Sequence, residues 1–262
     1  MMRLLSVVFS HVRISIANEL QYRVNFFVQL LQSLVGLAVG LVSISLVFRY
    51  TDQLGGWKQP DLLIVMGIYI TVGGFIATLV QPNMERLLRE IHRGSLDFAL
   101  LKPVDSQVMA SIRDLRFWAL TDVVMGLIVV GVGVTRLGRG IVAWQGFTFA
   151  CALLLGCVVI YSFWLILTSL AFWFVRLEDL FMIFQAINGA GRWPVSIYPS
   201  WLRILLTFLV PVAFAITVPA EALTGRLTPP ALLGSLAITA VFAALARLIW
   251  SRALRHYSGA SA

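Results

Sequence analysis

Charged residues are scarce in this chain. Asp, Glu, Lys and Arg make up 12% of its 262 residues, whereas hydrophobic residues make up 60% and the mean hydropathy is +0.90. A soluble domain carries roughly 25% charged residues, so the composition excludes an ordinary soluble protein and predicts a polytopic membrane protein. The net charge of +8 comes from basic residues spread over separate loops. Such a spread is typical of a membrane protein, in which Lys and Arg set the orientation in the bilayer, rather than of a protein that binds nucleic acid.

Residues that build metal and nucleotide sites are also few. Cys151 and Cys157 are six residues apart in one apolar run, on different sides of a helix, so we expect neither a disulfide nor a metal site from them. The three histidines fall in separate polar segments, at His11, His92 and His256. A phosphate-binding P-loop needs a Gly-Lys pair, but neither lysine, Lys58 or Lys102, follows a glycine. We therefore expect no metal ion and no cofactor bound by this chain.

Long uncharged runs dominate the sequence. About 20 apolar residues in a helix cross the hydrocarbon core of a bilayer, so the runs predict an all-α fold with six transmembrane helices and no internal repeat. The expected spans cover residues 24–48, 62–82, 117–135, 145–175, 180–198 and 227–247. Pro82 is expected to help end the second span. Gly36 and Gly40 in the first span have the four-residue spacing that permits close helix contact.

Two further segments have a different pattern. In residues 1–22, apolar and polar side chains fall on opposite faces of a helix, which predicts an amphipathic helix lying along the membrane interface. Residues 199–222 hold a short apolar run that contains Pro211 and Pro219. We interpret this segment as a re-entrant element on the outer side, tolerated where protein or a watery cavity covers its broken backbone. Polar residues that could pair there are Glu221 with Arg192 or Arg203.

The distribution of Lys and Arg decides between six and seven spans. With six spans, both termini and the polar segment 84–116 share one side, which holds thirteen of the twenty Lys and Arg residues against seven on the other. With seven spans, the C-terminal arginines would lie outside. Because Lys and Arg are in excess on the cytoplasmic side, we expect six spans, cytoplasmic termini and a cytoplasmic loop at 84–116.

The polar segment has a helical pattern of its own. One face of a short helix is apolar, with Leu87, Leu88 and Ile91, and the other is charged, with Glu85, Arg86, Arg89, Glu90 and Arg93. Gly94 is a natural helix stop, and Asp105 or Ser106 could cap a long helix that enters the membrane near Phe117. The apolar face can dock into a groove of a soluble partner or rest on lipid headgroups.

Polar residues inside the expected spans have two interpretations. Asp122 is the only acidic residue well inside a span, and an intramembrane carboxylate is costly and often functional. It either pairs with an arginine or a neighbouring helix, or it lines a conduit. The first span carries Asn25, Gln29 and Gln32 along one side. These three residues either form interhelical hydrogen bonds or line a translocation path.

Two stretches carry a resemblance to a known family. The first is Arg93-Gly94-Ser95-Leu96-Asp97-Phe98, continuing to Leu101-Lys102-Pro103-Val104. The second is Pro211-Val212-Ala213-Phe214 followed by Val218-Pro219-Ala220. With the layout of spans, they make the chain resemble the permease subunit of bacterial ATP-binding-cassette (ABC) transporters of type-2 exporter architecture, in a branch of uncharacterised permeases. The resemblance covers nearly the whole chain and says nothing about cargo.

The resemblance implies a mechanism for an ATP-driven exporter of the bacterial inner membrane. Two permeases, identical or paralogous, would pair among membrane lipids, and two ATPase subunits would bind ATP and Mg²⁺ below them. A coupling helix in the cytoplasmic loop would enter a cleft on each ATPase. Mapped onto this sequence, the coupling region comprises Glu85, Arg86, Leu87, Leu88, Arg89, Ile91, Arg93, Gly94, Asp97 and Phe98. This chain would itself be non-catalytic.

Two other classes of function were weighed against the permease. A transporter or channel subunit that works without ATP predicts paired intramembrane charges or inverted repeats, and neither is visible. A membrane-embedded enzyme acting on lipid needs converging His, Asp or Glu residues near one interface. The outer segment offers only Glu221, so this class is the least favoured.

Overall fold

The computed structural model describes residues 23–97, 105–173 and 189–257. The described residues form helices and turns and contain no strand. The longer helices are α2 (Arg23–Val47), α3 (Gln59–Phe75), α4 (Gln81–His92), α7 (Leu120–Arg136), α8 (Ala143–Ser169) and α12 (Pro229–His256). The shorter α-helices are α6 (Ser106–Ser111), α10 (Ser200–Ile204) and α11 (Val218–Leu223). The expected interfacial helix 1–22 and Phe98 lie outside the described residues.

Among the described residues, five helices are long and apolar enough to cross a membrane. They cover Val24–Val47, Gln59–His92, Phe117–Arg136, Ala143–Phe172 and Pro229–His256. A sixth candidate is the pair Ser200–Leu209 and Ala213–Leu223, which is bent by 85° at its break. These helices confirm the predicted all-α polytopic membrane fold.

The bent pair coincides with the segment predicted to be re-entrant. Its halves contain the π-helices η6 (Leu205–Leu209) and η7 (Ala213–Thr217), and Pro211 lies in the break between them. A proline lacks the N–H that would continue the helix across this point. The predicted fifth span, 180–198, lies partly outside the described residues. Its described part consists of the 3₁₀ turns η4 (Gly189–Arg192) and η5 (Val195–Ile197), so no α-helix continues to residue 198.

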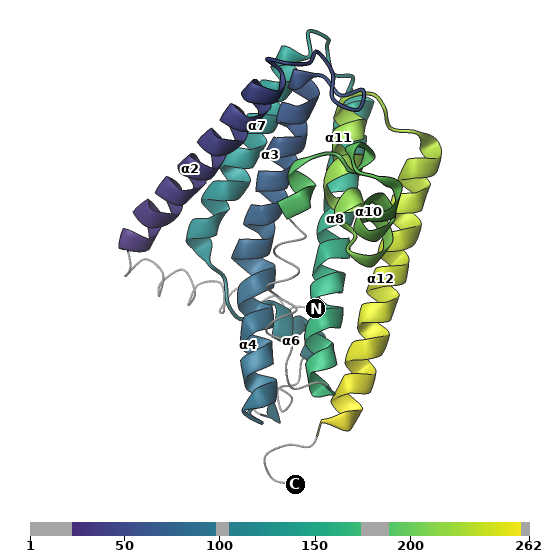
Figure 1. The fold of residues 1–262 in the computed structure, drawn as a ribbon. Helices are drawn as coiled ribbons and strands as arrows, with labels where there is room; N and C mark the ends of the chain where they lie inside the picture. Colours follow the sequence, from purple (N-terminus) through teal and green to yellow (C-terminus); the bar gives the residue numbers. More distant parts are fainter. Residues whose placement is uncertain (1–22, 98–104, 174–188, 258–262) are drawn as a thin grey trace.

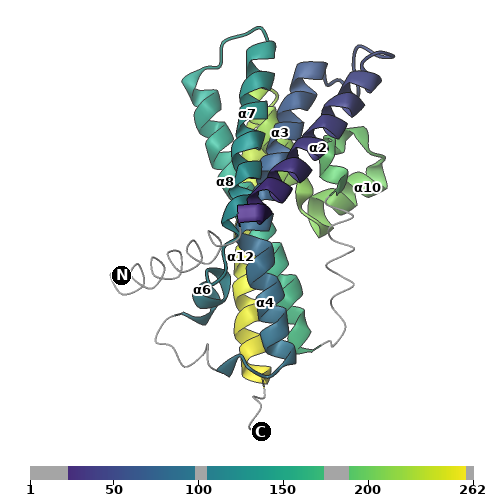
Figure 2. The ribbon, with the colours of Figure 1, turned by 90° about the vertical axis from the view of Figure 1, so that its left-hand side faces the viewer.

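The bundle has two distinct ends, shown in Figures 1 and 2. At the first, called here the hairpin end, lie the connections 48–58, 137–142 and 224–228. At the other, called the α4 end, α4 and α12 finish side by side with α6 next to them. The polar segment after α4 and the C-terminal arginines therefore share one end, as the six-span prediction requires.

The helix that contains the predicted second span does not end at Pro82. α3 continues through the π-helix η1 (Ile76–Val80) into α4, giving one helix of 34 residues from Gln59 to His92. Pro82 cannot donate a hydrogen bond to the carbonyl four residues earlier. That carbonyl, Thr78 O, instead accepts from the backbone N–H of Arg116 at 3.0 Å. The π-turn and this outside donor explain how the helix accommodates the proline.

The tightest helix contact joins α3 and α7 through glycines. Gly67 on α3 faces Gly126 on α7, and seven residues further along each helix Gly74 lies against Asp122 and Val123 while Gly133 lies against Leu63 and Ile64. A Cβ at Gly67 would lie 2.6 Å from Val130 N, and one at Gly126 would lie 2.6 Å from Gly67 O. Absence of a side chain at these positions lets the backbones touch, as in other membrane helix pairs. Of the glycines singled out in the sequence, Gly36 has nothing within 4 Å of an added Cβ.

We predict that Gly126→Leu disrupts the bundle. The new side chain would overlap the α3 backbone, and overpacking of this kind costs about 1–3 kcal/mol or more. The measurement is the yield of monodisperse protein in detergent and its apparent Tm. Gly131→Leu is the matched control, because an added Cβ there meets nothing within 4 Å. Equal behaviour of the two variants would contradict the close contact.

Candidate functional site

The apolar face of α4 packs inward. Leu87 and Leu88 are 2% and 5% exposed, and Ile91 packs against the same core. The prediction that these side chains insert into a partner's groove does not fit this burial, because the chain's own core already covers them. What α4 offers to solvent is its basic side, with Arg89, His92 and Arg93. The helix ends as predicted, since Gly94 has a φ of +64° and the N–H of Ser95 bonds back to Glu90 O.

Asn83 fastens the segment that leads from α6 into the membrane. Its carboxamide oxygen accepts from the backbone N–H groups of Arg113 and Asp114, at 2.8 and 3.0 Å. Its amide nitrogen donates to Leu79 O and Asp114 O, both at 2.7 Å. The segment is thereby held in a non-helical course. The long helix predicted from Asp105 or Ser106 to Phe117 is therefore wrong, because α6 ends at Ser111 and α7 begins only after the 3₁₀ turn Phe117–Ala119.

Ion pairs connect α4 to the same segment. Arg113, whose side chain is 8% exposed, donates to both oxygens of Glu90 at 2.8 and 2.9 Å. Arg86 pairs with Glu90 at 3.0 Å and with Asp114 at 2.8 Å. Glu85 pairs with Arg116 at 2.9 Å. Of the residues predicted to couple to an ATPase, Glu85 and Arg86 thus bind within this chain.

The C-terminal helix closes the α4 end. Tyr257 Oη accepts from the N–H of Leu96 at 3.2 Å, and Trp250 Nε1 donates to Ser106 Oγ at 3.2 Å. Arg247 pairs with Asp105 at 2.7 Å. The hydrogen bond from Arg247 lowers the pKa of Asp105 below its usual value, so this carboxylate stays ionised to lower pH. Asp105 also caps α6 as predicted, accepting from the N–H groups of Gln107 and Val108.

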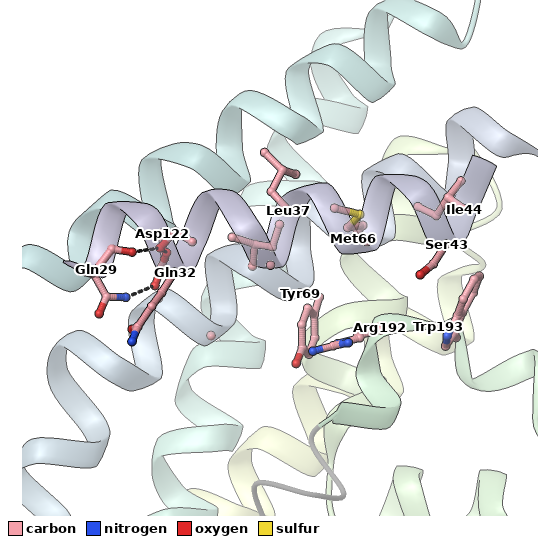
Figure 3. A pocket seen from close by; sticks show the side chains of 16 residues that line it. Gln29, Gln32, Leu37, Ser43, Ile44, Met66, Tyr69, Asp122, Arg192 and Trp193 are labelled. Carbon is pink, nitrogen blue, oxygen red and sulfur yellow. Dashed lines mark hydrogen bonds between the residues drawn. The ribbon is translucent and has the colours of Figure 1, made fainter. Parts of the chain in front are cut away.

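A second candidate site is a cavity of about 330 Å³ within the membrane part (Figure 3). It lies between α2 and α3 and also touches α7 and η4. Of the predicted conduit residues, Gln29, Gln32 and Asp122 line it. Asp122 accepts from Gln29 Nε2 at 2.9 Å and from Ser33 Oγ. It therefore pairs with a neighbouring helix, one of the two alternatives left open by the sequence, and lines the cavity as well. Asn25 is exposed and does not line the cavity.

The outer polar residues do not pair as predicted. Arg192 lies over the ring of Tyr69, 5.7 Å from its centroid, and lines the cavity. Arg203 donates to the carbonyl oxygens of Ser196 and Tyr198, at 2.9 and 3.3 Å. Among the described residues, neither arginine forms an ion pair with Glu221. Both arginines instead make contacts at the turns around η4 and η5. The hydropathy pattern did not reveal these turns.

Sequence reasoning missed an ion pair at the hairpin end. Asp61, 5% exposed, binds Arg226 at 2.7 Å, and Arg226 also lies over the ring of buried Trp57 at 4.5 Å. The two residues are 165 positions apart, so no local spacing could have indicated them. Within the described chain there is no group of three or more metal-ligating side chains, and both cysteines are free.

We predict that Asn83→Ala destabilises the α4 end. The change leaves the N–H groups of Arg113 and Asp114 without their acceptor, and a buried unsatisfied group costs about 1–3 kcal/mol. The apparent Tm of the purified protein should fall by several degrees. Asn25→Ala, at an exposed position, is the control. An unchanged Tm for Asn83→Ala would show that the segment is held by other contacts.

Comparison with known proteins identifies the chain at the level of a family. Residues 34–261 match the family described as ABC-2 family transporter protein. No curated protein matches the chain, and no solved structure matches it. The family match covers most of the chain and all the long helices except the start of α2. The chain therefore belongs to the ABC-2 transporter family and is an ABC-2 type permease, a multi-pass membrane protein.

Proposed function

We propose that this permease is one half of the membrane path of an ATP-driven exporter in the bacterial inner membrane. A second permease, identical or paralogous, completes the path, and two separate ATPase subunits bind ATP and Mg²⁺. The observation that carries the proposal is the helix Gln59–His92, which runs from the hairpin end to the exposed basic tip of α4. The α4 end and both termini face the cytoplasm in this proposal, in line with the excess of Lys and Arg.

The length of this helix supports a docking role for its tip. Its 34 residues correspond to about 51 Å of helix, whereas the hydrocarbon core is about 30 Å thick. In this proposal the last turns of α4 project beyond the membrane, and Figure 2 shows the ends of α8 and α12 beside them. A projecting helix end with exposed charges can reach a soluble subunit.

The contact surface we propose differs from the apolar face. Arg89, His92 and Arg93 are exposed, and Arg89 and Arg93 also border a hollow with Ser95. Basic side chains of this kind form charge-assisted hydrogen bonds with carboxylates of a partner. The buried Leu87 and Leu88 support the tip from within. The turn at Gly94 and the residue Asp97 stay part of the proposed coupling region.

Movement of the tip would be transmitted by two connections. The helix from Gln59 to His92 is continuous, so displacement of its end tilts the whole helix. Its glycine contact with α7 would then carry α7 along, and with it Asp122 in the cavity. The ion pairs of Glu85, Arg86 and Glu90 keep the segment between α6 and α7 attached to α4 during such a motion.

We predict that the double charge reversal Arg89→Glu with Arg93→Glu weakens ATPase binding. Lost charge pairs at the tip should reduce the amount of copurified ATPase by at least about fivefold, which corresponds to about 1 kcal/mol. The measurement is the ratio of ATPase to permease after affinity purification of the coexpressed subunits. Arg136→Glu, an exposed arginine at the opposite end, is the control. Full ATPase recovery in the double variant would overturn the proposed contact.

We predict a different result for Leu88→Ala. Removing this buried side chain leaves a cavity, which costs about 2–5 kcal/mol. The apparent Tm of the permease purified without any ATPase should therefore fall. If Leu88→Ala kept a normal Tm but no longer copurified with the ATPase, Leu88 would instead belong to the contact surface.

Coexpression also tests the alternative that the chain works without ATP. A transporter or channel subunit of that kind would purify without any ATPase from cells that carry its neighbouring genes. Copurification of an ATPase in stoichiometric amounts supports the exporter and excludes this alternative.

A further inference from the structure

We propose that the cavity between α2 and α3 binds an amphiphile whose anionic group pairs with Arg192. The ligand class is a phosphate- or carboxylate-bearing molecule with an apolar tail. The inference concerns the cavity alone and does not depend on how an ATPase docks.

Arg192 lies in the membrane part with an exposed side chain, and among the described residues it has no counter-charge. Its guanidinium lies over the ring of Tyr69. Tyr69 is ten residues after Gln59, the first residue of α3. Ten residues of helix rise about 15 Å, which is half the thickness of the hydrocarbon core. A Cβ at the adjacent Gly191 would lie 3.5 Å from Tyr69, which places η4 at the depth of Tyr69. No carboxylate in residues 23–97, 105–173 or 189–257 forms an ion pair with Arg192. A charge at this depth is costly unless it is paired.

Asp122 is not the missing partner of Arg192. Its two oxygens already accept from Gln29 and Ser33. Asp122 contacts α3 at Gly74, five residues beyond Tyr69, so it lies about 7.5 Å further along the helix. Figure 3 shows Asp122 and Arg192 at different places along the cavity. The guanidinium therefore has donors available to a ligand, in a planar arrangement that suits phosphate and carboxylate.

Away from Gln29, Gln32, Ser33, Ser43 and Asp122, the wall is mostly apolar. Leu37, Ile44, Met66 and Ile70 line the cavity, a composition typical of sites that enclose an apolar ligand and orient it by a few polar groups. Gly36 also lines it, and an added Cβ there would meet nothing within 4 Å.

The position of α2 indicates where the ligand enters. α2 lies at the outside of the bundle (Figures 1 and 2), and its apolar side chains Val35, Val39 and Val42 are exposed. The cavity behind it is therefore reached from the lipid side. An amphiphile partitions into that phase with its tail, whereas a free inorganic anion does not. This route favours an amphiphile over a soluble anion.

Photo-crosslinking of the full-length permease, purified with its coexpressed subunits, tests the site. The probe is phosphatidylglycerol with a diazirine in its acyl chain, in nanodiscs of phosphatidylcholine without nucleotide. We expect labelled peptides from α2 and α3. Excess dodecyl phosphate should compete, whereas dodecyl maltoside, dodecyltrimethylammonium and inorganic phosphate should not. Equal competition by inorganic phosphate would overturn the need for a tail, and equal competition by the cationic detergent would overturn the anionic preference.

Four variants test whether labelling depends on the charge of Arg192 and on the space beside Gly36, rather than on general effects on folding. Arg192→Gln should reduce labelling of α2 and α3 about tenfold, the size expected for loss of a charged hydrogen bond, and Arg192→Lys should retain part of it. Gly36→Leu should block labelling by filling the cavity. Arg203→Gln is the matched control, since this arginine binds only Ser196 and Tyr198 among the described residues. Each variant must keep its apparent Tm. Unchanged labelling in Arg192→Gln, or an equal loss in Arg203→Gln, would overturn the proposal.

A final arm distinguishes a resident lipid from a transported amphiphile. Adding ATP and Mg²⁺ to the complex should reduce labelling if the ligand is cargo and leave it unchanged if the ligand is a lipid held in place. Both results require the site at Arg192. Failure of ATPase copurification would affect only this arm, because the labelling without nucleotide stands by itself.

Discussion

The glycine contact between α3 and α7 is the constraint on which the rest of the bundle depends. Because Gly67, Gly74, Gly126 and Gly133 carry no side chains, the two backbones touch along two turns of each helix. In a bilayer such contact is a main source of helix association, since lipid tails are as apolar as leucine. This contact brings Asp122 to the edge of α3, where Gln29 and Ser33 of α2 can reach it. The outer position of α2, and the cavity behind it, follow from that arrangement.

A proline inside a long helix forms the second connection. Pro82 leaves the carbonyl of Thr78 free, and the N–H of Arg116 takes it. Asn83, the next residue, satisfies the N–H groups of Arg113 and Asp114. Pro82 and Asn83, which would weaken a helix elsewhere, therefore attach the segment that precedes α7 to α4. The same continuous helix lines the membrane cavity and carries the exposed tip, so it connects the proposed docking surface to the cavity.

At both sites, most charged groups pair within the chain. At the α4 end, Glu85, Arg86 and Glu90 bind partners within the chain, which leaves Arg89 and Arg93 available to another protein. In the cavity, Asp122 is satisfied by α2. Pairing within the chain removes the cost of burying these groups. An arginine without an ion pair among the described residues remains at each site, and we propose that it determines what the site binds.

The sequence by itself determined the membrane character, the all-α class, the broken segment around Pro211 and the amphipathic helix that ends at Gly94, because hydropathy, charge and proline act locally. It also singled out Asn25, Gln29, Gln32 and Asp122 as polar residues of a conduit or of interhelical contacts, and of these Gln29, Gln32 and Asp122 line one cavity. Only the tertiary structure decided which face of α4 is buried. An amphipathic pattern fixes the apolar side of a helix but not whether its own core or a partner covers it. The placement of Arg192 beside Tyr69 and of Asn83 beside Arg113 likewise depends on contacts between segments far apart in the chain, which no local pattern encodes.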